Sequence, residues 1–139
     1  DIGSGGGMPG IIIAIILKNL KKDIIVHLYE KSYHKSNFLK EVSKKLNLKT
    51  KIFQKDIFEI KKLETGTIMS RAFKPMSIIL KLVHENYFKY NNLIFFMGSN
   101  SRKIFENCKG EWNFEYTEKQ SITNKDSFLL NVKKIRKKN

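Results

Sequence analysis

A glycine-rich segment that opens an apolar helix constrains this chain more than any other feature. It reads GSGGGMPG over residues 3–10 and runs directly into IIIAIIL. Glycine adopts backbone angles with φ > 0 and lets a ligand lie against the main chain. A turn of this kind at a helix start also aims free N–H groups at that ligand. Because proline fits the first helical turn, we expect a ligand-binding loop followed by a buried helix over 9–19.

The rest of the chain alternates between strand and helix patterns. We expect strands at 23–30, 50–55, 66–73 and 91–98, and helices at 33–48, 75–88 and 101–108. In 33–48 the apolar residues Phe38, Leu39, Val42 and Leu46 recur with the helical period. This alternation predicts an α/β fold with a mostly parallel sheet. The last two strand-like segments, 111–122 and 126–135, have no helix between them and predict an antiparallel hairpin at the sheet edge.

Composition limits the class of protein. With 139 residues and 41% hydrophobic content, we expect one domain over 1–139. The net charge of +14 favours a polyanionic partner, nucleic acid ahead of an anionic membrane. Cys108 is the single cysteine, so neither a disulfide framework nor a cysteine metal site is expected, which fits a reducing cytoplasm. The longest apolar run, 11–17, is too short to span a bilayer, and no metal site is expected.

The segment ahead of the glycine loop is short. A loop of this type normally follows a buried strand, yet only Asp1 and Ile2 precede it. We therefore interpret the chain as an N-terminally truncated domain whose first strand is largely missing.

An acidic residue about twenty positions after the loop limits the kinds of ligand that the loop could bind. Glu30 ends the strand at 23–30, about twenty residues past the loop, where an acid bonds ribose hydroxyls. No G-K-[ST] follows the glycines, so the loop is not of the Walker type. Loop and acid together favour a dinucleotide or S-adenosylmethionine. A packing turn in an α/β protein is the alternative.

Three segments together carry a resemblance to a known family. DIGSGGGMPG, YEKSYHKSNFLKEV and SRAF resemble the small-subunit ribosomal RNA methyltransferase G (GidB) family, and the terminal DSFLLNVKKI is similar to the family's last strand. The resemblance covers essentially the whole chain. It implies a Rossmann-like S-adenosylmethionine-dependent methyltransferase fold and methyl transfer to N7 of a guanosine in 16S ribosomal RNA. The implied partner is 16S ribosomal RNA or the small ribosomal subunit, with a monomeric enzyme in the cytoplasm.

The resemblance also implies a cofactor site. Gly3 and Gly5 would face the amino-acid end of S-adenosylmethionine with Met8 near it, and Glu30 would take the ribose. The adenine would lie at KDIFEI, against Asp56, Ile57 and Phe58. Phe58 stands where the family has an acid, so a backbone N–H would make that contact. Arg71 of SRAF matches the family's binding arginine.

Arg71 is also singled out by its position. It lies at the carboxyl end of a strand, where open α/β sheets bind their ligands, between Ser70 and Ala72. We expect it to bond the cofactor carboxylate or an RNA phosphate, and it is the one candidate for a catalytic residue. Guanine N7 carries an in-plane lone pair and no proton, so the chemistry needs alignment and desolvation rather than a base.

Other residues are assigned by their surroundings. Cations that follow strand ends are the candidates for RNA phosphate contacts: Lys31, Lys35, Lys74, Arg102 and Lys103. The basic end, 133–138, is a weaker candidate. We expect His27, His34 and Cys108 to be structural, and the alternating Trp112, Phe114 and Tyr116 to pack in the core, with base stacking as the alternative.

Two other functions remain open. A nicotinamide-dependent oxidoreductase would want a strict G-x-G-x-x-G and a terminal helix, whereas the sequence predicts a hairpin there. A catalytically silent RNA-binding module would account for the difference between KDIFEI and the family's pattern, in which an acid stands at the position of Phe58.

Overall fold

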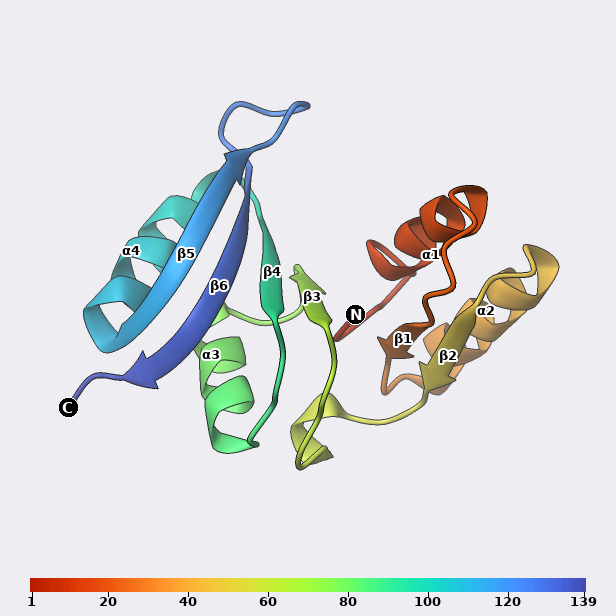
Figure 1. Cartoon of the computed structure of the whole chain (residues 1–139), viewed down its shortest axis with the longest axis horizontal. Coiled ribbons are helices and arrows are strands. Elements are labelled where there is room, and N and C mark those ends of the chain that lie inside the picture. The colour runs from red at the N-terminus through yellow and green to blue at the C-terminus, as the bar shows by residue number, and fades with distance from the viewer. The chain divides into compact units, whose positions relative to one another are not determined.

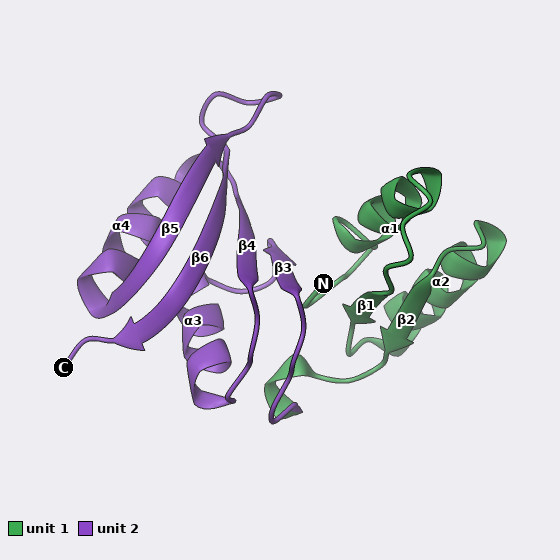
Figure 2. Cartoon of the chain, viewed as in Figure 1, with its two compact units in different colours: residues 1–59 green, residues 60–139 purple.

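The computed structural model describes residues 1–139 and divides them into two compact units, Asp1–Glu59 and Ile60–Asn139 (Figure 2). Each unit combines strands with helices (Figure 1). None of the helices has the length and hydropathy needed to cross a membrane. That residues 1–139 form one methyltransferase domain stays a prediction.

The first unit holds a two-stranded parallel sheet. Its elements are α1 (Gly10–Asn19), β1 (Val26–Tyr29), α2 (Tyr33–Lys45), β2 (Thr50–Phe53) and the short helix η1 (Ile57–Glu59). β1 pairs with β2 in parallel, and Ile2 forms a parallel bridge with Tyr29 on the other edge of β1. The Tyr29 N–H donates to the Asp1 carbonyl at 3.0 Å, and the Gly3 N–H donates to the Tyr29 carbonyl at 3.0 Å. The residues that lead into the glycine loop therefore run parallel to β1.

One hydrophobic cluster joins the helices and the sheet of this unit. Its buried members are Ile11, Ala14, Val26, Leu28 and Leu39. The prediction that the helix over 9–19 is buried is wrong for part of α1, because one face of the helix packs on β1 while Ile12 and Ile16 are exposed.

The predicted helix 33–48 is also shorter and less covered than expected. It ends at Lys45, and Asn47 takes φ 48, a left-handed conformation that asparagine tolerates. Phe38 and Leu46 are exposed rather than buried, whereas Leu39 lies in the core. The predicted strand 23–30 likewise begins only at Val26, with Ile24 and Ile25 exposed.

The second unit holds a four-stranded mixed sheet. Its elements are β3 (Thr67–Arg71), α3 (Met76–Glu85), β4 (Asn92–Met97), η2 (Ser99–Ser101), α4 (Arg102–Glu111), β5 (Trp112–Gln120) and β6 (Phe128–Lys137). The strand order is β3-β4-β6-β5. β3 and β4 are parallel, while β6 is antiparallel to both β4 and β5. The predicted C-terminal hairpin is confirmed, and its second strand lies between β4 and the edge strand β5.

Both helices of this unit cover the same face of the sheet. His84 of α3 packs edge-on against Trp112 of β5, with ring centroids 5.5 Å apart. The ring centroid of Phe105 on α4 lies 5.0 Å from that of Tyr116 and 6.2 Å from that of Phe128. No helix of the second unit covers the other face, which carries the alternate residues of each strand.

The strands form two sheets rather than the single open sheet that the sequence predicts.

Candidate functional site

The glycine loop is held against the end of β1 by main-chain hydrogen bonds. The N–H groups of Gly3 and Ser4 both donate to the Tyr29 carbonyl at 3.0 Å. Gly5 takes φ 53, and a Cβ there would meet only the Gly3 carbonyl oxygen, at 3.9 Å. The space above Gly5 is therefore open, and the residue must be glycine for its backbone angle rather than for packing.

The Glu30 carboxylate, just after β1, binds the glycine loop. The residue is 8% exposed. Its Oε2 accepts the Gly5 N–H at 2.8 Å, and its Oε1 accepts the Ser32 N–H at 2.8 Å. A carboxylate has about four lone-pair sites, so acceptor capacity remains for two hydroxyls of a ligand. The predicted pairing of loop and acid is thus seen as direct contact between them.

Asp1 also supports the loop, and the sequence reasoning missed it. Its Oδ2 accepts the Gly10 N–H at 3.1 Å, at the first residue of α1. The Ser4 hydroxyl donates to the Asp1 carbonyl at 3.1 Å. A carboxylate at a helix start satisfies a free N–H group, and an acid just ahead of a glycine loop is the signal that points to it.

The residues predicted to contact adenine lie in the segment that follows β2. Asp56 accepts the Phe58 N–H on Oδ1 at 3.1 Å and pairs with Lys31 through Oδ2 at 3.4 Å. The Ile57 side chain is buried and that of Phe58 is half-buried. Lys31 therefore already has a carboxylate partner, and a ligand would meet Ile57 only through its backbone.

The remaining candidates of the first unit lie at its surface. Met8 is exposed next to the glycines. Lys35 is exposed in the first turn of α2, and its N–H donates to the Ser32 hydroxyl at 3.4 Å. The structure thus brings Gly3, Gly5, Glu30, Lys31 and Asp56 together at the carboxyl ends of β1 and β2. Their contacts with a cofactor or with RNA stay predictions.

Arg71 ends β3 in the second unit. Its side chain is exposed and makes no ion pair or hydrogen bond anywhere in residues 1–139. Together with the end of β4 and the β5–β6 loop it lines a cavity of about 520 Å³. An arginine without a protein partner beside a cavity is available to bind an anion.

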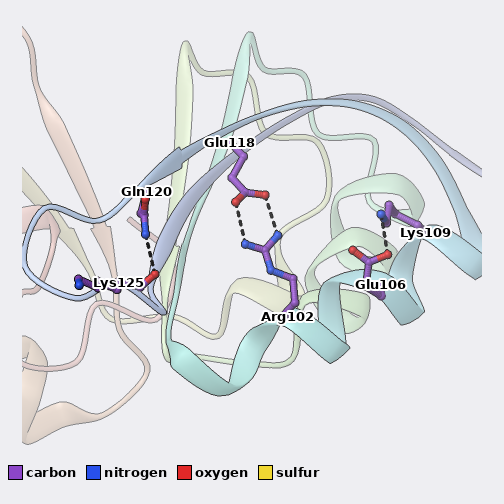
Figure 3. Close-up of polar contacts among 6 residues, drawn as sticks. All are labelled: Arg102, Glu106, Lys109, Glu118, Gln120 and Lys125. Atoms are coloured by element: carbon purple, nitrogen blue, oxygen red, sulfur yellow. Dashed lines mark hydrogen bonds and ion pairs between the residues drawn. The ribbon is translucent and has the colours of Figure 1, made fainter.

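Arg102 differs from the other predicted RNA contacts. Its Nη1 and Nη2 donate to the two carboxylate oxygens of Glu118, each at 2.7 Å (Figure 3). The guanidinium also lies 3.9 Å from the centroid of the Phe128 ring. The hydrogen bond to Arg102 holds the pKa of the Glu118 carboxyl below its usual value. Lys74 and Lys103 are exposed, and Lys74 lines a neighbouring cavity of about 440 Å³.

The aromatic residues predicted to pack in the core differ in burial. Trp112 is buried as predicted, whereas Phe114 is half-buried and Tyr116 is exposed, although both rings contact Phe105. The His27 side chain is exposed on β1, and its ring centroid lies 5.2 Å from that of Phe53, edge-on. Partial desolvation, followed by the Lys51 charge, lowers the pKa of His27. No group of three or more histidine, cysteine or acidic residues in 1–139 could hold a metal ion.

Cys108 is expected to be a poor nucleophile. Burial, followed by the Glu111 charge, raises the pKa of its thiol to about 11. Because the thiolate is the reacting form, alkylation by iodoacetamide at about pH 8 should be about a hundredfold slower than in the unfolded chain. Mass spectrometry of the protein in native buffer and in denaturant measures both rates. Equal rates would contradict the assignment.

Comparison with known proteins identifies the family. The family model described as "GidB: rRNA small subunit methyltransferase G" matches residues 1–131. This chain belongs to the GidB family. The ribosomal RNA small subunit methyltransferase G of Pelagibacter ubique (strain HTCC1062) is 60% identical to it over 139 residues, which cover 100% of this chain and 65% of that relative. The chain thus spans about 65% of the length of this GidB relative.

Solved structures show the same fold. A putative rRNA-methylase from Clostridium thermocellum has a TM-score of 0.65 at 12% identity, covering 99% of this chain and 86% of that one. The Pyrococcus abyssi tRNA (uracil-54, C5)-methyltransferase, in complex with S-adenosyl-L-homocysteine, has a TM-score of 0.60 at 13% identity, covering 95% and 32%. The predicted Rossmann-like methyltransferase fold, with an antiparallel C-terminal hairpin on a parallel sheet, is confirmed.

Proposed function

We propose that this GidB chain belongs to an S-adenosylmethionine-dependent enzyme that methylates N7 of a guanosine in 16S ribosomal RNA. The observation that carries the proposal is Glu30, which is buried at the end of β1 and bonded to the Gly5 N–H at 2.8 Å. The family match over residues 1–131 supports small-subunit ribosomal RNA as the substrate. The proposed partner is the small-subunit ribosomal RNA, and the net charge of +14 suits a polyanion.

The residues present fit the cofactor. Glu30 retains acceptor capacity for ribose hydroxyls, and the open space above Gly5 leaves room for a ligand against the backbone. The solved relative in fold from Pyrococcus abyssi holds S-adenosyl-L-homocysteine, the product form of that cofactor. When bound, S-adenosylmethionine supplies an electrophilic methyl group on a sulfonium.

The chain's own task in this reaction is to position the reactants. The guanine N7 lone pair would form the new bond to the methyl carbon, and the electrons of the broken carbon–sulfur bond would stay on sulfur. N7 carries no proton, so no residue has to act as a base. Glu30 orients the ribose, and Arg71 supplies a cation at the carboxyl end of β3. Alignment and exclusion of water contribute the rate enhancement.

The test uses the purified full-length protein. Isothermal titration calorimetry with S-adenosylmethionine and with NAD measures the cofactor preference, and labelled methyl transfer to 16S ribosomal RNA and to small subunits measures the activity. We expect binding of S-adenosylmethionine alone and label at guanine N7. NAD binding would favour the oxidoreductase, and RNA binding without either cofactor would favour the silent module.

Arg71→Lys tests the role of the guanidinium. Lysine keeps the charge but loses the planar pair of donors, so we expect methyl transfer to fall about tenfold with an unchanged circular dichroism spectrum. Lys81→Arg, an exchange between the same two residue types on the exposed surface of α3, is the control and should leave the rate unchanged. An Arg71→Lys variant with the wild-type rate would mean that Arg71 contributes a generic charge or nothing.

A further inference from the structure

One row of residues crosses all strands of the second unit on the face that its helices leave open. Arg71 of β3 pairs with Phe96 of β4. Phe96 pairs with Leu129 of β6, and Leu129 pairs with Lys119 of β5. Directly paired residues point to the same face of a sheet. We call Arg71, Phe96, Leu129 and Lys119 the platform row.

All four residues of the platform row line the cavity of about 520 Å³. The row has an aromatic and an aliphatic side chain in the middle and a cation at each end. Its two ends are three strand spacings apart, or about 14 Å between Cα atoms. A flat apolar surface between two cations matches the chemistry of a nucleotide, with a base to stack and a phosphate on either side.

No carboxylate lines this cavity. The row one residue earlier, Ser70, Phe95, Leu130 and Glu118, points to the opposite face, where Glu118 is bonded by Arg102. Both cations of the platform row therefore face a cavity whose lining holds no acid. The cavity is suited to an anion and not to a cationic ligand.

A short ordered loop forms the far wall. The Gln120 side-chain amide donates to the Lys125 carbonyl at 2.8 Å (Figure 3), and the Ser121 N–H donates to the Ser127 carbonyl at 2.8 Å. These bonds join the two ends of the loop. Ile122, which lines the cavity, is 98% exposed and adds an apolar edge to the wall.

We propose that the platform row is the subsite for a single-stranded RNA nucleotide, whose base stacks on Phe96 and whose phosphate is bound by Lys119. Arg71, the cation that the proposed function uses, lies at the other end of the row. The inference rests on that function and adds the place where the RNA substrate is held. Stacking on an aromatic ring accepts any base, so the subsite holds the nucleotide without reading its sequence.

Fluorescence anisotropy with a labelled single-stranded RNA rich in guanosine tests the subsite in the full-length protein. Phe96→Leu keeps an apolar side chain but removes the ring, and we expect RNA to bind about tenfold more weakly. Lys119→Ala removes one phosphate contact, so the slope of log Kd against log salt should fall by about 0.7. S-adenosylmethionine affinity should stay unchanged in both variants.

Lys125→Ala is the matched control. Lys125 lies on the same loop and has the same charge, but it does not line the cavity. We expect its slope to equal that of the wild type. If Lys119→Ala and Lys125→Ala behave alike, or if wild-type protein does not bind the RNA, the subsite is wrong. If Phe96→Leu fails to fold, the Lys119 and Lys125 pair decides alone.

The two proposals fail in different ways. A wild-type protein that binds no S-adenosylmethionine and transfers no methyl group would overturn the proposed function, whatever the anisotropy shows. A protein that binds the cofactor and methylates RNA, but whose Phe96→Leu and Lys119→Ala variants bind RNA like the wild type, would overturn the subsite alone.

Discussion

Replacing Gly7 with alanine is expected to destabilise the protein by about 3 kcal/mol. Gly7 takes φ 95, in the region that side chains rarely adopt. An added Cβ would also lie 2.6 Å from Ile11 Cγ1 and 3.1 Å from Leu39 Cδ2. Both neighbours belong to the core of the first unit, so neither moves without disturbing α1 or α2.

The adjacent Gly6 supplies the control. Its φ lies outside the left-handed region, and nothing lies within 4 Å of an added Cβ. Gly6→Ala should change stability by less than about 0.5 kcal/mol. Denaturant unfolding of both variants measures the difference. Equal midpoints for the two would show that the loop relaxes around the new methyl group.

Glu30→Gln is expected to weaken S-adenosylmethionine binding about a hundredfold. Each carboxylate oxygen of Glu30 accepts a backbone N–H at 2.8 Å, from Gly5 and from Ser32. A glutamine amide must turn its NH2 group toward one of them, so a donor would face a donor. The variant therefore loses a loop contact as well as the charge that attracts the ribose hydroxyls.

Titration calorimetry with S-adenosylmethionine measures the loss. Glu41→Gln makes the same change on the exposed surface of α2 and should bind like the wild type. A Glu30→Gln variant that keeps wild-type affinity would mean that the ribose is held elsewhere, and Glu30 would then only support the loop.

The local patterns predicted most of the elements. The glycine loop, Glu30 and the hairpin were predictable because each depends on neighbouring residues or on a fixed spacing along the chain. The exposure of Ile12 and Phe38 was not, because helix periodicity does not say how many faces of a helix receive a partner. Residue type predicts both as core.

Contacts between residues that are far apart in the chain could not be predicted from the sequence either. Arg102 and Glu118 are separated by 16 positions, and their pairing depends on α4 lying against β5. The platform row joins residues of four strands through the register of the sheet. In the sequence, nothing distinguishes Lys119 from other surface lysines. Only the register of the four strands shows that it belongs to the same row as Arg71.

The position of β6 in the sheet has a consequence for synthesis on the ribosome. β6 is the last strand in sequence but lies between β4 and β5. Until residues 128–137 have emerged, β4 has β3 as its only neighbour and β5 has none. Long-range pairings of this kind form slowly, and an unpaired strand edge is open to other chains while it waits. The nascent second unit therefore has its most aggregation-prone interval just before β6 is translated.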